Sequence, residues 1–206
     1  MTGQNGRVHT RPVGRRALLV EVDGAEAALA LATWARTRRV DAVDVVPAAA
    51  SVLFDGVGDL AGLVEELSQW VPSSAPAEGG LVEIPVSYDG ADLEFVAGAW
   101  GVDVAAVVER HTSIEFVASF CGFAPGFSYL RGLPERLAVP RLDAPRSRVP
   151  AGAVALAGAW CGVYPTASPG GWRILGTTDV VLWDQDRASP ALLPPGARVR
   201  FREAAR

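Results

Sequence analysis

The sequence predicts an α+β protein of two domains: an α/β domain, then a domain of short β-strands. Its 206 residues suffice for two small domains, and a composition half hydrophobic and one fifth charged can bury a core. Residues 72–80, PSSAPAEGG, have the composition of a linker. Helical and strand patterns alternate before this linker, and short strands with Gly/Pro turns dominate from residue 115 onward. We therefore expect domains at 14–78 and 81–206.

The first half of the N-terminal domain begins with a strand and a helix. Residues 16–22, RALLVEV, alternate apolar and other residues as a half-buried strand does. Residues 25–39 are rich in Ala and Leu and end in arginines, which favour a helix C-terminus. Two β-like runs follow at 40–46 and 51–55, separated by Pro47.

A second helix and a last strand complete the predicted pattern. Apolar residues fall at helical spacing from Leu60 to Val71, and Asp59 is placed to cap the start of this helix. Residues 81–88, LVEIPVSY, are typical of another strand. The resulting order, β-α-β-β-α-β, matches a ferredoxin-like unit.

The C-terminal domain begins with two short helices, predicted at 92–100 and 103–111 and separated by Gly101. The later strands predict an all-β barrel or sandwich and lie at 115–120, 153–158, 172–176, 179–184 and 197–201. Residues 121–140 contain three glycines and three prolines, so we expect no central strand there. The aromatic residues of this segment belong either to a packed corner or to the rim of a site.

Composition restricts the possible functions. A net charge of −4 and a pI near 5.2 argue against nucleic acid as the main partner. All 19 basic residues are arginine, which excludes a P-loop and a Schiff-base mechanism. No apolar run reaches the ~18 residues that span a membrane, so we expect no membrane partner. Residues 1–16 are basic and polar, and we expect them to be a disordered tail on a cytoplasmic protein.

His111 is the only histidine inside a predicted domain and the only side chain whose ordinary pKa suits proton transfer near neutrality. It is our candidate catalytic residue; the alternative is a helix-terminal histidine bonded to backbone carbonyls. Cys121 and Cys161 lie 40 residues apart and, with His111, offer at most three metal ligands. We expect two buried thiols and no metal.

Two further segments could recognise an anion. Residues 140–152 contain Arg141, Arg146 and Arg148, and the planar guanidinium group suits carboxylate or phosphate. The alternative is a solvated loop. Residues 164–172, YPTASPGGW, contain a tight Gly-Gly turn whose backbone amides could hold an anion, although most such turns bind nothing.

Three stretches carry a resemblance to a known family: CGFAPGFSYLRGLPERLAVPR, PRSRVPAGAVALAG and GVYPTASPGGWRILG. They are similar to the signature blocks of the 5-oxoprolinase B-subunit family, also labelled allophanate hydrolase subunit 1 or carboxyltransferase domain, subdomain C and D. The family includes a sporulation-kinase inhibitor. The resemblance covers about residues 14–202 and implies an N-terminal ferredoxin-like domain and a C-terminal cyclophilin-like β-barrel.

The resemblance also implies a function. Such a chain would be the B subunit of an ATP-dependent complex that opens 5-oxo-L-proline to L-glutamate, and would be inactive alone. Its partners would be the A and C subunits of the complex, the latter a second barrel protein, and ATP would be used by the complex. The alternative is a regulatory or binding module, such as a histidine-kinase inhibitor. Neighbouring genes for the A and C subunits would favour the enzyme.

In this family, two loops meet at a groove on the barrel, which makes residues 121–140 part of a site rim. The implied residues that bind a small anionic substrate are Phe123, Pro125, Gly126, Phe127, Tyr129, Arg146, Arg148, Tyr164, Ser168, Pro169, Gly170, Gly171 and Trp172.

The sequence departs from the family pattern near this groove. Ser128 and Asp179 replace prolines, Trp160 and Cys161 replace Gln-Thr, and Thr177 replaces an arginine. The identity of the substrate therefore stays open.

Overall fold

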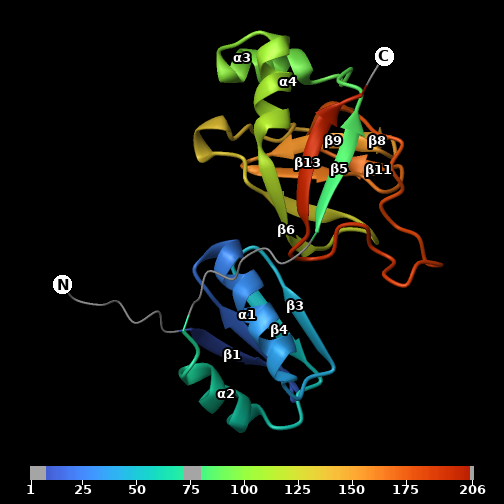
Figure 1. Ribbon diagram of the computed structural model, residues 1–206. Coiled ribbons are helices and arrows are strands. Elements are labelled where there is room, and N and C mark those ends of the chain that lie inside the picture. Colours follow the sequence, from blue (N-terminus) through green and yellow to red (C-terminus); the bar gives the residue numbers. More distant parts are fainter. Residues whose placement is uncertain (1–7, 72–79, 205–206) are drawn as a thin grey trace. The chain divides into compact units, whose positions relative to one another are not determined.

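The computed structural model describes residues 8–71 and 80–204, which belong to two compact units that divide between residues 76 and 77 (Figure 1). Residues 72–79 of the predicted linker lie outside the described residues, as do residues 1–7 of the predicted tail. No helix in the described part of the chain is long and apolar enough to cross a membrane.

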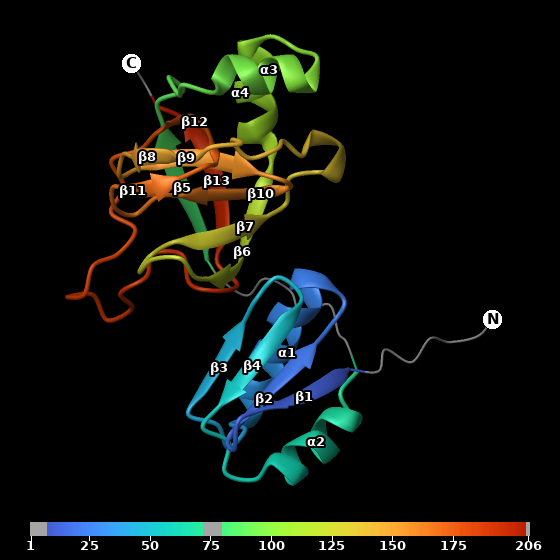
Figure 2. The ribbon, with the colours of Figure 1, turned by 180° about the vertical axis from the view of Figure 1, so that it is seen from behind.

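The first unit is a four-stranded antiparallel sheet with two helices on one face (Figures 1 and 2). Its elements are β1 (His9–Val13), β2 (Ala17–Glu21), α1 (Gly24–Arg38), β3 (Asp44–Pro47), β4 (Ser51–Asp55) and α2 (Leu60–Ser68). Alternate strand residues such as Leu18, Val20 and Phe54 are buried against the helices, as period-2 patterning requires.

The helix signals in the sequence are largely confirmed. The backbone turns left-handed at Arg39, directly after α1, and the Asp59 carboxylate accepts hydrogen bonds from Ala61 and Gly62 at the start of α2. The predicted end of α2 at Val71 is wrong. The helix stops at Ser68, and Val71 is 75% exposed.

The predicted order β-α-β-β-α-β is also wrong. Residues 9–13, expected to be disordered, form β1 and pair with β2 across a turn at Gly14, whose φ is 65°. The strand predicted at 81–88 is β5 (Leu81–Val86), and it pairs in parallel with β13 (Arg198–Glu203) of the second unit. The first unit therefore runs β-β-α-β-β-α, in the sheet order β1-β2-β4-β3.

The second unit is a nearly closed β-barrel, so the prediction of a barrel is confirmed. Its seven strands run in the order β12 (Arg173–Thr177), β9 (Ala153–Ala157), β10 (Trp160–Val163), β7 (Ser128–Arg131), β6 (Glu115–Cys121), β13 and β5. The edge strands β12 (Arg173–Thr177) and β5 approach each other where Ser87 and Thr177 exchange backbone hydrogen bonds of 2.8 and 2.9 Å. Helices α3 (Leu93–Trp100) and α4 (Val104–Ser113) lie at one end of the barrel (Figure 1).

Longer strands were predictable and very short ones were not. The predicted strands that form are β6 (Glu115–Cys121), β9 (Ala153–Ala157), β12 and β13. Those that the patterns did not reveal are β7 (Ser128–Arg131), β8 (Arg146–Val149), β10 (Trp160–Val163) and β11 (Ser168–Gly170). The strand predicted at 179–184 is absent, apart from a bridge between Trp183 and Ala191. The expectation of no central strand within 121–140 is wrong, because β7 lies between β6 and β10.

β9 is buried on both faces and so separates two cores. Val154 and Leu156 face the barrel interior. Ala153, Ala155 and Ala157 face outward, into a second apolar cluster that contains Phe127, Tyr164 and Trp172. This outer cluster is where the candidate site lies.

Candidate functional site

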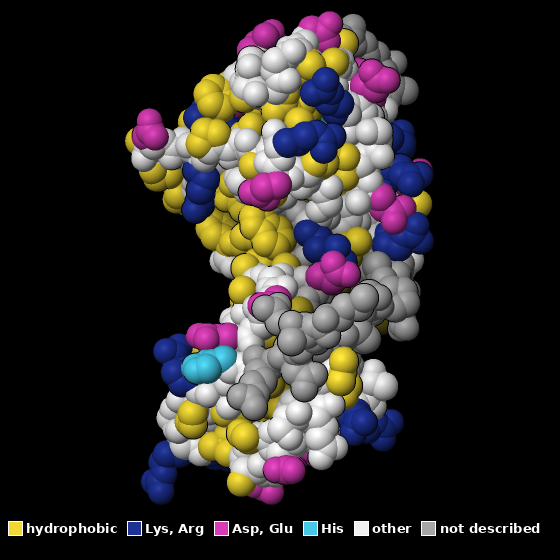
Figure 3. Space-filling model, turned by 90° about the vertical axis from the view of Figure 1, so that its left-hand side faces the viewer, with side chains coloured by type: hydrophobic (Ala, Val, Ile, Leu, Met, Phe, Trp, Pro, Cys, Tyr) yellow, Lys and Arg dark blue, Asp and Glu magenta, His cyan; other side chains and the backbone are white. Residues whose placement is uncertain are grey.

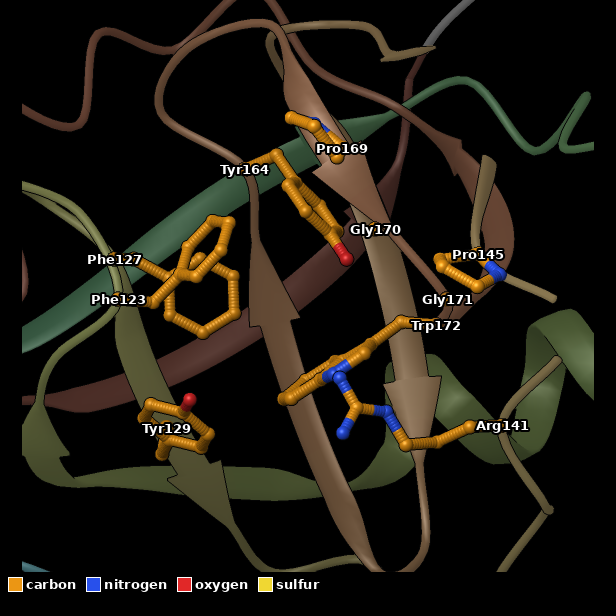
Figure 4. A pocket seen from close by; sticks show the side chains of 10 residues that line it. All are labelled: Phe123, Phe127, Tyr129, Arg141, Pro145, Tyr164, Pro169, Gly170, Gly171 and Trp172. Carbon is orange, nitrogen blue, oxygen red and sulfur yellow. The ribbon is translucent and has the colours of Figure 1, made fainter. Parts of the chain in front are cut away.

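A pocket of about 220 Å³ opens on the outer side of the barrel wall (Figure 4). Its walls come from the 122–127 loop, β7, the segment before β8, and β11 with the turn that follows. The lining residues are Phe123, Phe127, Tyr129, Arg141, Pro145, Tyr164, Pro169, Gly170, Gly171 and Trp172. The structure thus brings together eight of the predicted binding residues, all except Pro125, Gly126, Ser168, Arg146 and Arg148.

Phe127 is the centre of the pocket's aromatic wall and is only 2% exposed. The rings of Phe123, Tyr129, Tyr164 and Trp172 lie edge-on to it, with centroid distances between 5.1 and 5.4 Å. Edge-to-face contacts of this kind are favourable because the positive edge of one ring meets the negative face of another. The wall is therefore fixed by ring packing.

Two glycines allow the rings to approach the backbone. A Cβ at Gly162 would lie 2.9 Å from the Phe127 ring and 3.1 Å from that of Trp172. A Cβ at Gly170 would overlap the Tyr164 hydroxyl. Gly170 of the Pro-Gly-Gly motif thus makes room for an aromatic side chain.

Phe123 stands at the rim of the pocket in an unusual conformation. Its φ of 70° is in the left-handed region, which side chains rarely adopt, and its side chain is 60% exposed. Val181 and Trp183 of the same unit are exposed too, and Figure 3 shows yellow hydrophobic patches among arginines on one face of this unit. A strained, exposed aromatic residue at a pocket rim is a feature of binding sites.

Arg141 supplies the only charge among the described residues that line the pocket, and Figure 4 shows it extending inward from its wall. Burial raises the pKa of Tyr164, against the opposing influence of the Trp172 N–H and the charges of Arg141 and Arg146. The Tyr164 hydroxyl is therefore protonated at neutral pH. The pocket is smaller than the ~300–1,000 Å³ of drug-sized sites, so its chemistry suits a small anion.

The other two arginines of the predicted loop lie elsewhere. Arg146 forms an ion pair with Asp92 at 3.0 Å and donates to the Trp172 carbonyl at 3.4 Å. Arg148 is exposed, and neither Arg146 nor Arg148 lines the pocket. The sequence indicated an arginine from this segment, but it did not reveal that Arg141 is the one that faces the pocket.

Three predicted residues are neighbours of the pocket rather than its lining. A Cβ at Gly126 would come within 2.8 Å of Trp183, so the loop and residues 182–183 pack closely. Pro125 belongs to the same loop. Ser168 pairs with Val149 of β8, and its hydroxyl is buried without a hydrogen-bond partner among the described residues.

His111 lies at the C-terminal end of α4, fully buried inside the barrel, and does not line the pocket. Its Nδ1 lies 2.7 Å from the Tyr88 hydroxyl, its Nε2 lies 3.5 Å from the Cys161 sulfur, and its ring stacks on Phe201 at 4.7 Å. Burial lowers the pKa of His111 to about 3. A general base must reach its substrate, so this geometry gives the predicted catalytic role no support.

The alternative predicted for His111, hydrogen bonding to backbone carbonyls, is wrong, because the partners of its ring nitrogens are the side chains of Tyr88 and Cys161. Cys161 is buried as expected, and burial raises the pKa of its thiol; Cys121 is only partly buried. Within 8–71 and 80–204, no group of three or more His, Cys, Asp or Glu side chains is placed to hold a metal ion.

Three of the residues that depart from the family pattern, Ser128, Trp160 and Thr177, make structural contacts. The Ser128 hydroxyl donates to the Leu193 carbonyl at 2.6 Å. Trp160 packs edge-on against Phe120, at 5.4 Å between centroids. Thr177 closes the barrel through its bridge to Ser87, whereas Asp179 is exposed.

Fold and pocket together define a class: a β-barrel protein with a small aromatic site that carries one positive charge. The chain belongs to the family described as carboxyltransferase domain, subdomain C and D, whose model matches residues 8–193. The family resemblance seen in the sequence is therefore confirmed.

Three curated relatives bear the name of the 5-oxoprolinase B subunit. The chain is 48% identical to that of Escherichia coli O157:H7 over 143 residues, 67% of this chain and 66% of the relative. Identity is 40% with that of Bacillus subtilis (67% and 59% covered) and 38% with that of Haemophilus influenzae (82% and 84% covered). The match thus covers 66% and 59% of the length of the first two relatives, less than two thirds of either.

Solved structures agree. Crystalline TTHA0988 is 37% identical, with a TM-score of 0.79, over 93% of this chain but 40% of its own. PH0987 from Pyrococcus horikoshii is 32% identical, with a TM-score of 0.58, over 95% and 97%. The urea amidolyase of K. lactis, at 18% identity and a TM-score of 0.72 over 100% of this chain and 15% of its own, shares the fold.

Proposed function

We propose that this chain is the B subunit of a cytoplasmic, ATP-dependent 5-oxoprolinase, which opens 5-oxo-L-proline to L-glutamate. The observation that carries the proposal is the 38–48% identity to three relatives with that name. The pocket also supports the proposal, because its small volume and single guanidinium group match 5-oxo-L-proline, a small ring with one carboxylate.

In this proposal the pocket binds and orients the ring. The guanidinium of Arg141 pairs with the substrate carboxylate, a charge-assisted contact that can be bidentate. The ring lies against Phe127 and Trp172, and the protonated hydroxyl of Tyr164 is a donor for the lactam oxygen. Water then adds to the lactam carbon, and cleavage of the C–N bond frees the amine of glutamate.

The pocket lacks the groups that would carry out hydrolysis unaided. None of the described residues that line it is a Ser, Cys, His, Asp, Glu or Lys, so it offers no pair of nucleophile and general base. We therefore infer that the reaction needs homologues of the A and C subunits, and that this chain alone is inactive.

ATP does not fit this pocket. A volume of about 220 Å³ and a single guanidinium suit a small anion, whereas a nucleoside triphosphate needs more space and several cations. We accordingly propose that ATP binds the complex at a site other than this pocket.

The direct test is calorimetric titration of the purified chain with 5-oxo-L-proline. Arg141→Ala should weaken binding about ten- to a hundredfold, because it removes a charged hydrogen bond worth ~1.5–3 kcal/mol. Arg141→Lys should restore binding only in part. Arg148→Ala is the matched control from the same segment and should bind like wild type. Equal affinity in wild type and Arg141→Ala would refute this role for the pocket.

Glutamate formation tests the need for partners. The chain with ATP and 5-oxo-L-proline should release no glutamate until the A and C subunits have been added; robust release by the chain alone would overturn that part of the proposal.

The absence of a nucleophile–base pair among the described lining residues also favours the second candidate, a non-catalytic module such as a histidine-kinase inhibitor. Failure of the complete mixture, with inhibition of a purified histidine kinase, would select that candidate.

A further inference from the structure

Asp92, just before α3, carries a carboxylate that the proposed reaction does not use. The residue is 5% exposed. Its side chain makes no capping bond to α3 but accepts a 2.7 Å hydrogen bond from the backbone N–H of Ile174 in β12. It also pairs with Arg146 at 3.0 Å and with Arg173 at 3.5 Å. The buried carboxylate of Asp92 therefore forms ion pairs with two arginines.

Each of the two arginines also donates to a backbone carbonyl in a different wall of the pocket. The Nε of Arg173 donates to the Pro140 carbonyl at 3.0 Å, directly before Arg141. The Nη1 of Arg146 donates to the carbonyl of Trp172 at 3.4 Å. Both walls that flank the charged side of the pocket are thus connected to Asp92 through one arginine each.

Further contacts limit the freedom of this arrangement. The guanidinium of Arg173 lies 3.6 Å from the ring centroid of Phe95, which restrains its plane. The two walls are joined directly by a 2.7 Å hydrogen bond from Leu142 N–H to the Gly171 carbonyl. The position of Arg141, between Pro140 and Leu142, therefore depends on contacts on both sides.

The electrostatics make Asp92 the centre of the cluster. Neighbouring guanidinium groups repel each other, and the carboxylate between them supplies the compensating charge. Removing one partner from a buried ion pair leaves uncompensated charge that must be resolvated, so the remaining groups move toward water. Without the charge on Asp92, both arginines would lose the geometry that lets them reach the two carbonyls.

We propose that Asp92 is a positioning residue of the pocket: through Arg146 and Arg173 it sets the two walls and thereby the guanidinium of Arg141, without touching the ligand. This inference rests on the proposed function only for the choice of ligand. It also gives Arg146 an indirect role in place of the direct contact predicted from the sequence.

Asp92→Asn is the first test, because the amide oxygen can still accept from Ile174 while the charge is lost. Calorimetry of the full chain with 5-oxo-L-proline should show about tenfold weaker binding. Arg173→Lys should also weaken binding. An ammonium group lacks the planar fork with which Arg173 pairs with Asp92 and donates to the Pro140 carbonyl at the same time. The matched control is Glu115→Gln, a carboxylate that binds Arg198 and Arg200 elsewhere on the barrel. It should bind like wild type.

A double-mutant cycle separates positioning from a loss of stability. If Asp92 acts through Arg141, then Asp92→Asn should not weaken binding further once Arg141→Ala is present, whereas the losses in melting temperature should still add. Equal losses of affinity in both backgrounds would overturn the proposal.

Hydrogen exchange provides a readout that needs no ligand. Asp92→Asn should speed exchange of the Leu142 amide and of residues 170–174, while Glu115→Gln should leave both unchanged. If wild type fails to bind 5-oxo-L-proline, the proposed function is wrong, and exchange alone decides the role of Asp92. Unchanged exchange in these segments would refute it.

Discussion

The barrel wall separates two aromatic clusters. In the inner cluster the polar groups are hydrogen-bonded to one another, whereas in the outer cluster they line a pocket. Inside, His111 is enclosed by Phe116 and Phe201, and its ring nitrogens are bonded to Tyr88 and Cys161. Outside, the rings around Phe127 leave a pocket whose guanidinium and hydroxyl groups face the space between them. A titratable side chain that is buried among rings and hydrogen-bonded, such as His111, is thus part of the core, whereas the polar groups available to a ligand lie where packing is incomplete.

The largest expected effect tests whether both clusters are equally well packed. Phe201→Ala inside and Phe127→Ala outside should each lower the free energy of unfolding by about 3–5 kcal/mol, because each removes a fully buried ring. Denaturant titration measures this. Only Phe127→Ala should also weaken binding of 5-oxo-L-proline beyond what unfolding explains. A loss below ~1 kcal/mol for Phe127→Ala would show that the outer cluster is loosely packed.

The buried histidine should give the chain a distinctive pH dependence. The pKa of His111 is about 3 when folded, against about 6.5 unfolded, so between these values the unfolded state binds more protons. This contribution to stability is complete above pH 6.5 and is lost as pH falls, at about 1.4 kcal/mol per pH unit. His111→Gln should remove that part of the slope. Identical slopes in His111→Gln and wild type would contradict the buried, neutral state.

The smallest expected effect lies at the pocket rim. Phe123→Gly should relieve the left-handed backbone strain and leave the chain as stable as wild type, or up to about 1 kcal/mol more stable. Phe123→Ala keeps the strain and should be less stable than Phe123→Gly. Both should weaken ligand binding, since both remove the ring. Thermal unfolding with parallel calorimetry measures the two effects, and tight binding by both variants would remove Phe123 from the site.

Much of the candidate site was predictable because its lining residues lie in continuous stretches of sequence that resemble the family's signature blocks. The segments around Phe127 and Trp172 contain most of the pocket lining, so these two stretches of sequence were enough to locate it. The choice among Arg141, Arg146 and Arg148 was not predictable. Arg146 is turned away from the pocket by its ion pair with Asp92, which lies 49 residues before Arg141 in the chain and also pairs with Arg173.

Elements with a clear local period or cap follow from the amino-acid sequence alone. Helix α2 begins at Leu60, directly after Asp59, because the Asp59 carboxylate can accept from free N–H groups. The burial of residues in β4 alternates because successive side chains face opposite sides. The pairing of the strands, in contrast, depends on the tertiary fold. β1 joins β2, and β5 joins β13 more than a hundred residues away, because backbone hydrogen bonds are alike in every strand. The tertiary fold also decided the burial of His111, since which side chains surround a ring depends on residues far apart in the chain.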